Sequence, residues 1–130
     1  MDNIFEETKN IMKAYNIKAN KSLGQNFLIN SEVVEKIIES SELSTDDLVI
    51  EIGPGLGTLT KYLLKKAGKV ICIELDTRMV KILKNRFASR DNFEIINDDV
   101  LKVDLNKIIK ENKSTGKIKN VKIVANLPYY

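Results

Sequence analysis

Apolar residues are spaced along this chain in two ways, in short unbroken runs and at every third or fourth position. Short runs rich in β-branched residues predict buried strands, and the wider spacing predicts helices with one buried face. Strands are predicted at 48–52, 70–74, 93–96 and 121–125, and helices at 3–15, after Asn30, from Leu59, after Asp76 and from Leu105. Because strand and helix alternate from residue 48 onward, the pattern predicts an α/β protein with a parallel sheet and flanking helices.

Several local features refine this pattern. Asn30 or Ser31 suits the N-cap of the second helix, whose buried stripe is predicted to comprise Val33, Val34, Ile37 and Ile38. Gly68 resembles the glycine that ends many helices. Residues 111–120 are polar and predict a loop before the last strand.

The first predicted strand leads into a turn with glycine at every second position, Gly53, Gly55 and Gly57. Glycine lets a ligand approach the backbone closely, and the helix that follows offers unpaired N–H groups. Thr58 stands where a dinucleotide-binding Gly-x-Gly-x-x-Gly turn has its third glycine, which disfavours a pyrophosphate ligand. The Glu-x-Gly-x-Gly-x-Gly pattern is similar to the first motif of S-adenosylmethionine (SAM) methyltransferases, and an ordinary strand–helix turn is the alternative.

Composition limits the chemistry. The chain has no histidine, so the usual general base and commonest metal ligand are missing, and chemistry without a metal is favoured. Cys72 is the single cysteine, no apolar run reaches the length of a bilayer span, and no signal peptide is evident, so a cytoplasmic location is expected. The net charge is +3, and the basic stretches at 61–90 and 107–122 are either a surface for nucleic acid or solvated helix faces.

Polar residues follow the predicted strands, at the edge where ligands of doubly wound sheets bind. Glu74 ends the second strand about twenty residues after the glycine turn, where an acid can accept hydrogen bonds from two ribose hydroxyls. A helix cap is the alternative, but Asp76 suits that role better. Asp98 and Asp99 end the third strand, where one of them could accept from an adenine amino group or simply close a turn.

The fourth strand ends at Asn126-Leu127-Pro128-Tyr129. The Asn126 side-chain oxygen and a backbone carbonyl can both accept from an adenine amino group, which favours a pyramidal nitrogen with an available lone pair. Pro128 fixes the turn, and Tyr129 can stack on a base removed from its helix. The alternative is a common Asn-x-Pro turn that closes a strand.

Four segments together resemble the ribosomal RNA adenine dimethyltransferases, especially the bacterial small-subunit branch. They are residues 21–28, 51–60, 73–76 and 126–130, in order and at suitable spacing within residues 18–130. The resemblance implies a Rossmann-like SAM-dependent methyltransferase fold and the N6-dimethylation of two adjacent adenosines in small-subunit rRNA during ribosome biogenesis. It also implies the cofactor SAM, no metal, and the pre-ribosomal small subunit as partner.

The resemblance assigns roles residue by residue. Asn126, Leu127, Pro128 and Tyr129 match the catalytic motif. The positions that match the family's SAM-binding residues are Asn26, Leu28, Gly53, Glu74, Asp99 and Asn126, and Gly55 belongs to the same turn. Of the two adjacent acids, the family pattern selects Asp99. Residues 1–29 then form a helix and a cofactor-covering arm, and residues 30–130 the first half of the methyltransferase domain.

The family continues past the last motif with further strands and a helical domain, so the chain is expected to be truncated after its fourth strand and inactive alone. In the family's strand order, third, second, first, fourth, the fourth strand becomes an exposed edge that is expected to self-associate. The related large-subunit enzymes of macrolide resistance are the first alternative function. A non-catalytic assembly factor that binds pre-ribosomal RNA and a nicotinamide-dependent oxidoreductase are the others.

Overall fold

A computed structural model of the chain describes residues 3–18 and 30–125. The predictions for Asn26 and Leu28, and for the motif at residues 126–129, lie outside these described residues. The elements are α1 (Ile4–Ala14), α2 (Ser31–Ser41), β1 (Asp47–Ile52), α3 (Thr60–Lys66), β2 (Lys69–Ile73), α4 (Thr77–Arg86), β3 (Phe93–Ile96), the 3-10 helix η2 (Val100–Lys102), α5 (Leu105–Lys113) and β4 (Asn120–Ala125).

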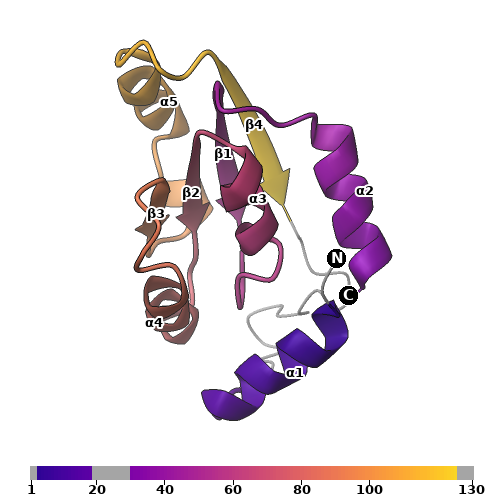
Figure 1. Cartoon of the computed structure of the whole chain (residues 1–130). Coiled ribbons are helices and arrows are strands. Elements are labelled where there is room, and N and C mark those ends of the chain that lie inside the picture. The colour runs from indigo at the N-terminus through magenta and orange to yellow at the C-terminus, as the bar shows by residue number, and fades with distance from the viewer. Residues whose placement is uncertain (1–2, 19–29, 126–130) are drawn as a thin grey trace.

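The four strands form one parallel sheet in the order β3-β2-β1-β4 (Figure 1). Val49 pairs in register with Val70 of β2 and with Lys122 of β4, and Cys72 pairs with Ile95 of β3. Parallel strands need crossover connections, which α3, α4 and α5 supply. The α/β fold with flanking helices and the strand order predicted from the sequence are confirmed.

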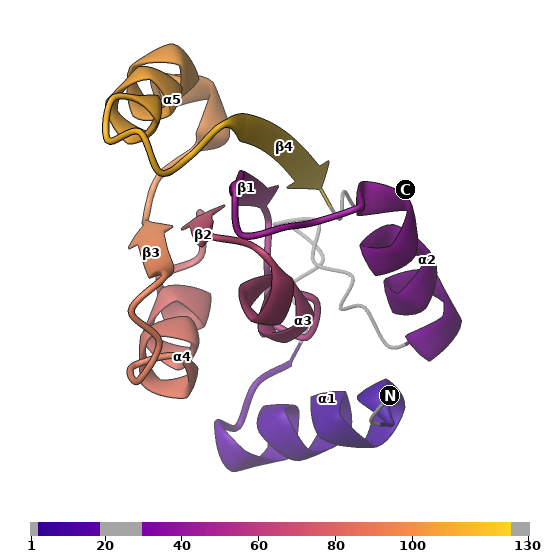
Figure 2. The ribbon, with the colours of Figure 1, turned by 45° about the horizontal axis from the view of Figure 1, so that its top comes forward.

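Helices cover both faces of the sheet, as Figure 2 shows with α5 on one side and α2, α3 and α4 on the other. Alternate residues of β1 point to opposite faces. Val49 packs with Val34, Leu63 and Leu83 of the three-helix side. The second face is a separate apolar cluster, which comprises Leu48, Ile50, Ile71, Ile73 and Ile118 with the partly buried apolar residues of α5. The sheet is therefore buried on both faces, which explains the unbroken apolar runs.

Lys122 ties the edge strand β4 to α2 and β1. Its Nζ donates to the carbonyls of Ser41 and Glu42, at 2.5 and 3.0 Å, and lies 3.3 Å from Asp47 Oδ2. Burial opposes ionisation of Asp47, but the Ser44 N–H and Lys122 outweigh it and hold the pKa of this carboxyl below its ordinary value. Among the described residues no strand pairs with the outer side of β4, and the predicted self-association stays a prediction.

Three local predictions differ from the structure, at Val33, at Gly68 and at the loop of residues 111–120. Val33 is not part of the buried stripe of α2, because its side chain is 40% exposed while Val34 and Ile38 face the core. Gly68 does follow a helix, but it lacks the positive φ of a helix-ending glycine. A Cβ there would lie 2.1 Å from the Thr45 carbonyl oxygen, so the close approach of two backbone segments requires glycine. In addition, α5 continues to Lys113 and shortens the loop predicted at 111–120.

Gly57 contacts α4 directly, and this contact can be measured through stability. Its φ is +83°, and a Cβ would lie 2.7 Å from Phe87 Cε2 and 2.8 Å from Leu83 Cδ2. Gly57→Ala is therefore expected to lower the free energy of unfolding by about 2 kcal/mol, from backbone strain and displaced side chains. Gly116 is the matched control, because its φ is +77° and a Cβ would meet nothing within 4 Å.

Gly116→Ala should lower the free energy of unfolding by about 1 kcal/mol, from backbone strain alone. Urea denaturation of both variants measures the difference. Equal losses at Gly57 and Gly116 would contradict the predicted contact between the turn and α4.

No helix in the described part of the chain is both long and apolar enough to cross a membrane.

Candidate functional site

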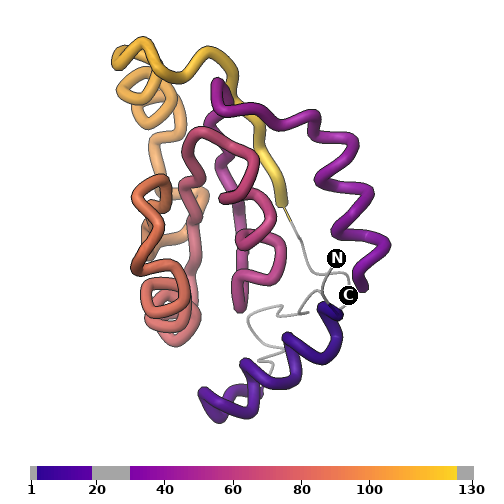
Figure 3. Tube along the Cα trace, viewed as in Figure 1, coloured from indigo at the N-terminus to yellow at the C-terminus, as the bar shows by residue number. Residues whose placement is uncertain are grey.

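The carboxyl ends of the first three strands meet at one edge of the sheet, below β1 and β2 in Figure 3. The backbone N–H of Gly53 donates to the Ile73 carbonyl at 3.0 Å, and the N–H of Glu74 donates to the Ile96 carbonyl at 3.0 Å. These two bonds continue the pairing beyond the strands. They bring the glycine turn, Glu74 and the residues after β3 together, as the sequence predicted.

The glycine turn between β1 and α3 adopts conformations that favour glycine. Gly53, Gly55 and Gly57 have φ values of +68°, +59° and +83°. Residues other than glycine rarely adopt such φ values, which explains the alternate spacing of the glycines. The Gly57 N–H donates to the Pro54 carbonyl at 3.0 Å and closes the turn. Thr58 is buried, with 4% of its surface exposed.

Glu74 links this turn to the start of α4. Its Oε1 accepts from the Gly55 N–H and its Oε2 from the Asp76 N–H, both at 3.0 Å. Only 8% of the residue is exposed. Burial raises the pKa of the Glu74 carboxyl, and the N–H groups of Asp76 and Gly55 oppose that rise. Each carboxylate oxygen can accept a second hydrogen bond, so the group suits a ligand with two adjacent hydroxyls.

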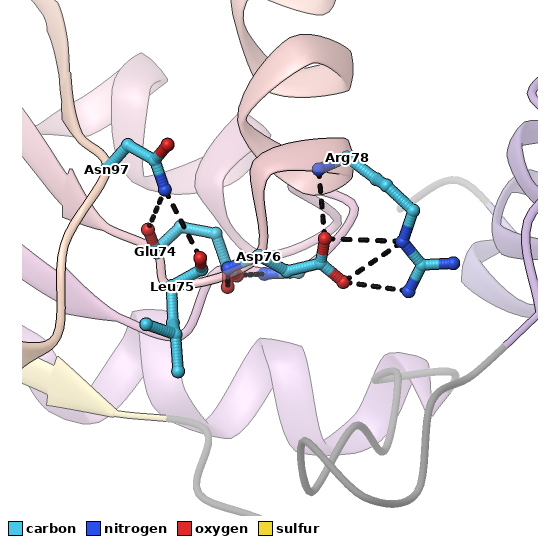
Figure 4. A network of polar contacts seen from close by, with 6 residues as sticks. Glu74, Leu75, Asp76, Arg78 and Asn97 are labelled. Atoms are coloured by element: carbon cyan, nitrogen blue, oxygen red, sulfur yellow. Dashed lines mark hydrogen bonds and ion pairs between the residues drawn. The ribbon is translucent and has the colours of Figure 1, made fainter.

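Asp76 takes the capping role that the sequence predicted for it. Its Oδ1 accepts from the Arg78 N–H at 2.9 Å, and the Arg78 guanidinium lies 2.8 Å from Oδ2 (Figure 4). Because Asp76 caps α4, the Glu74 carboxylate is left to face the turn. This division of roles agrees with the preference for a ligand-binding Glu74 over a capping one.

Asn97 is a site residue that the sequence reasoning missed. Its Nδ2 donates to the Glu74 carbonyl at 2.9 Å and to the Leu75 carbonyl at 3.3 Å (Figure 4). It thereby fixes the segment after β2 from the end of β3. The only available signal was its position directly before the acidic pair at 98–99.

Asp98 and Asp99 both make local contacts. Asp98 Oδ1 accepts from the Asp99 N–H at 2.8 Å, and Asp99 Oδ1 accepts from the Leu101 N–H at 2.9 Å and caps η2. Asp98 is exposed and Asp99 is half-buried, so neither carboxylate is committed to the core. Two apolar side chains are exposed at the same edge, Leu75 at 55% and Leu101 at 90%.

Glu51, the first residue of the glycine motif, is buried with 1% of its surface exposed. The Thr60 hydroxyl donates to its Oε1, and Cys72 Sγ donates to the same oxygen at 3.6 Å. Burial raises the pKa of Glu51 to about 7, with hydrogen bonds from Thr60 and Cys72 opposing the shift and the charge of Glu74 adding to it. Glu51 therefore links β1, α3 and β2 beneath the turn and does not face the ligand edge.

The described edge thus combines three features. A ligand can approach the backbone closely at the glycine turn, Glu74 can accept from paired hydroxyls, and acidic and apolar side chains are exposed after β3. These features fit a nucleoside-like ligand. The structure brings Gly53, Gly55, Glu74 and Asp99 to the same edge, and their ligand roles stay predictions. The other predicted residues, Asn26, Leu28, Asn126, Leu127, Pro128 and Tyr129, lie outside the described residues.

Comparisons with known proteins agree with this geometry. The model of the family described as ribosomal RNA adenine dimethylase matches residues 16–130. A curated relative from Alkaliphilus metalliredigens, named ribosomal RNA small subunit methyltransferase A, is 50% identical over 124 residues. That alignment covers 95% of this chain and 42% of the relative, so the chain spans less than half the length of that protein.

Two solved structures share the fold. A dimethyladenosine transferase from Plasmodium falciparum is 33% identical, with a TM-score of 0.64 over 80% of this chain and 34% of that one. The 23S rRNA methyltransferase ErmE is 28% identical, with a TM-score of 0.58 over 77% of this chain and 48% of that one. Both comparisons place the described sheet and helices within a methyltransferase fold.

Proposed function

Because the chain belongs to the ribosomal RNA adenine dimethylase family, we propose that it binds SAM and serves the N6-dimethylation of two adjacent adenosines in small-subunit rRNA. SAM supplies an electrophilic methyl group on its sulfonium sulfur, so neither a metal nor a histidine base is required.

One observation carries the cofactor part of the proposal, the contact of Glu74 with the glycine turn. The carboxylate is fixed at 3.0 Å from both the Gly55 and Asp76 N–H groups and keeps a second acceptor site on each oxygen. It is therefore preorganised to accept the two ribose hydroxyls. Asp99 would accept from the adenine amino group, and Gly53 would allow the cofactor to approach the backbone.

The remaining roles are carried over from the family motif. Asn26 and Leu28 would complete the cofactor site. The Asn126 side chain and the Leu127 carbonyl would accept from the target amino group, which frees the nitrogen lone pair for attack. Pro128 would fix the turn that holds both acceptors, and Tyr129 would stack on the target base.

The choice of small-subunit over large-subunit rRNA rests on the degree of likeness. The relative named for the small subunit is 50% identical, whereas the 23S rRNA methyltransferase ErmE is 28% identical. The large-subunit enzymes typically have isoleucine after the asparagine and lack the Gly-Pro-Gly form of the first turn. Gly53-Pro54-Gly55 and Leu127 therefore point to the same choice. Large-subunit methylation is therefore the second candidate.

The decisive test is a transplant. The corresponding segment of the Alkaliphilus metalliredigens relative is replaced by this chain, and methyl transfer from labelled SAM to unmethylated small subunits is measured. We expect dimethylation of two adjacent adenosines in small-subunit rRNA and none of large-subunit rRNA. A folded chimera that binds S-adenosylhomocysteine but transfers no methyl group, or that prefers large-subunit rRNA, would contradict the proposal.

Within the active chimera, Asn126→Ala is expected to lower kcat by about 100-fold, because one of the two acceptors for the amino group is lost. Single-turnover methylation measures this step directly. Asn120→Ala, at the start of β4, is the matched control and should leave kcat unchanged. A kcat for Asn126→Ala close to that of the control would refute the assigned role.

A further inference from the structure

We propose that Arg86 is a positioning residue that holds the peptide plane between Leu56 and Gly57 in the cofactor-binding turn, and that Glu7 of α1 holds Arg86 in place. The role in cofactor binding rests on the proposed function. The contact with the turn does not, and the two are tested separately below.

Arg86 lies at the end of α4 and donates in two directions. Its Nη1 donates to the Leu56 carbonyl, and its Nη2 donates to Glu7 Oε1 at 2.7 Å. The guanidinium also lies 5.0 Å from the centre of the Phe87 ring. The side chains of Arg86 and Glu7 are only 15% and 17% exposed, so this ion pair is largely shielded from solvent. Shielded, charge-assisted bonds of this kind are stronger than exposed ion pairs.

The carbonyl that Arg86 contacts belongs to the most adaptable part of the turn. Leu56 lies between Gly55 and Gly57, both with positive φ, and glycine restricts the backbone least. Glu74 fixes the Gly55 N–H from the side of β2. Arg86 fixes the peptide plane between Leu56 and Gly57 from the side of α4. The turn is therefore held on both sides of the Gly55–Leu56 peptide group by two charged side chains.

Apolar packing brings α1 and α4 to the same place. Leu56 is 2% exposed and packs with Met79 and Ile82 of α4, and the partly buried Ile11 and Met12 of α1 pack against this cluster. Figure 3 shows α1 running below the carboxyl ends of the strands, next to α4. The matched family range begins at residue 16, after α1. The ion pair thus gives α1 a direct connection to the cofactor-binding turn.

Glu7 has a second cationic neighbour, Lys61 of α3, whose Nζ lies 3.6 Å from Oε2. Removing Glu7 therefore affects two contacts, and only one of them leads to the turn. A double variant separates these effects. If Glu7 acts on the turn through Arg86, then Glu7→Gln should cause no further change in the turn once Arg86 is replaced and can no longer reach both partners.

The test compares Glu7→Gln, Arg86→Lys and the double variant with two matched controls on exposed positions of the same helices or their ends, Glu6→Gln and Arg90→Lys. Lysine keeps the charge but loses the planar fork that donates in two directions. The readouts are amide hydrogen exchange at residues 55–57 and the dissociation constant of S-adenosylhomocysteine. Urea denaturation identifies any exchange that comes from global unfolding.

We expect both single variants to speed exchange in the turn by about tenfold and to weaken S-adenosylhomocysteine binding by about fivefold to tenfold, the loss of one partly buried charge-assisted bond. The double variant should match Arg86→Lys, and the controls should match the unsubstituted chain. Single variants that match the controls would overturn the proposal, as would faster exchange with unchanged affinity or additive losses in the double variant.

If neither the unsubstituted chain nor the chimera bound S-adenosylhomocysteine, the proposed function would be wrong. Amide exchange in the turn would still decide whether Arg86 and Glu7 hold it.

Discussion

Glu74→Ala is expected to weaken the binding of S-adenosylhomocysteine by about 2–4 kcal/mol, or roughly 30- to 1000-fold, because two charge-assisted hydrogen bonds to the ribose are lost. Glu74 is 8% exposed and is fixed by two N–H donors, so its carboxylate is held in one orientation before the ligand binds. Isothermal titration of the variant and the unsubstituted protein measures the loss. A change of less than about twofold would remove Glu74 from the ribose site.

A second ligand separates the ribose contacts from a simple collapse of the turn, since Glu74→Ala also leaves the Gly55 N–H without its acceptor. The unsubstituted protein should bind S-adenosylhomocysteine more tightly than its 2′-deoxy analogue, and Glu74→Ala should bind both equally weakly. Equal losses for both ligands would mean that Glu74 only supports the turn. Glu94→Ala, an exposed acid of β3 paired with Lys69, is the control and should leave both affinities unchanged.

Glu51 is expected to make the stability of the protein fall between about pH 4.5 and pH 7. Burial raises the pKa of its carboxyl from 4.5 to about 7 in the folded state. The folded protein then binds more protons than the unfolded chain in this range, so the free energy of unfolding decreases as pH rises. The stabilisation is fully present below pH 4.5 and is lost as pH rises through about 7, a total of about 3 kcal/mol.

Glu51→Gln isolates this contribution, because glutamine stays neutral and its side-chain oxygen can still accept from Thr60 and Cys72. Relative to the unsubstituted protein, the variant should gain about 3 kcal/mol between pH 4.5 and pH 8. Urea denaturation at several pH values measures both profiles. Subtracting the profile of the unsubstituted protein from that of the variant removes the effects of two other carboxyl groups. These are Glu74, whose pKa is also raised by burial, and Asp47, whose lowered pKa acts at more acidic pH.

Thr60→Val provides an independent check on the same group. The Thr60 hydroxyl favours the ionised form of Glu51, so its removal should move the loss of stability to higher pH. Parallel pH profiles for the unsubstituted protein and Glu51→Gln would show that folding does not raise the pKa of Glu51.

The spacing of apolar residues was enough to predict the elements and their order. Unbroken apolar runs marked the strands because both faces of a parallel sheet are buried, and the periodic segments marked the helices between them. The family match at residues 16–130 confirmed the resemblance drawn from the motifs. Glu74 and the three glycines were predicted as site residues because each has a chemical requirement that only a few residue types meet at that spacing.

The contacts that hold the site depend on how distant elements pack and could not be predicted from the sequence. Arg86 and Glu7 are 79 positions apart and look like ordinary charges on helix faces, yet Arg86 donates both to Glu7 and to the Leu56 carbonyl. Val33 and Val34 are the same residue type, and only the orientation of α2 decides which one is buried. Gly68 is required because the Thr45 carbonyl, which is distant in sequence, leaves no room for a Cβ. Spacing along a chain reports the local period of an element, whereas contacts between elements depend on how the elements pack.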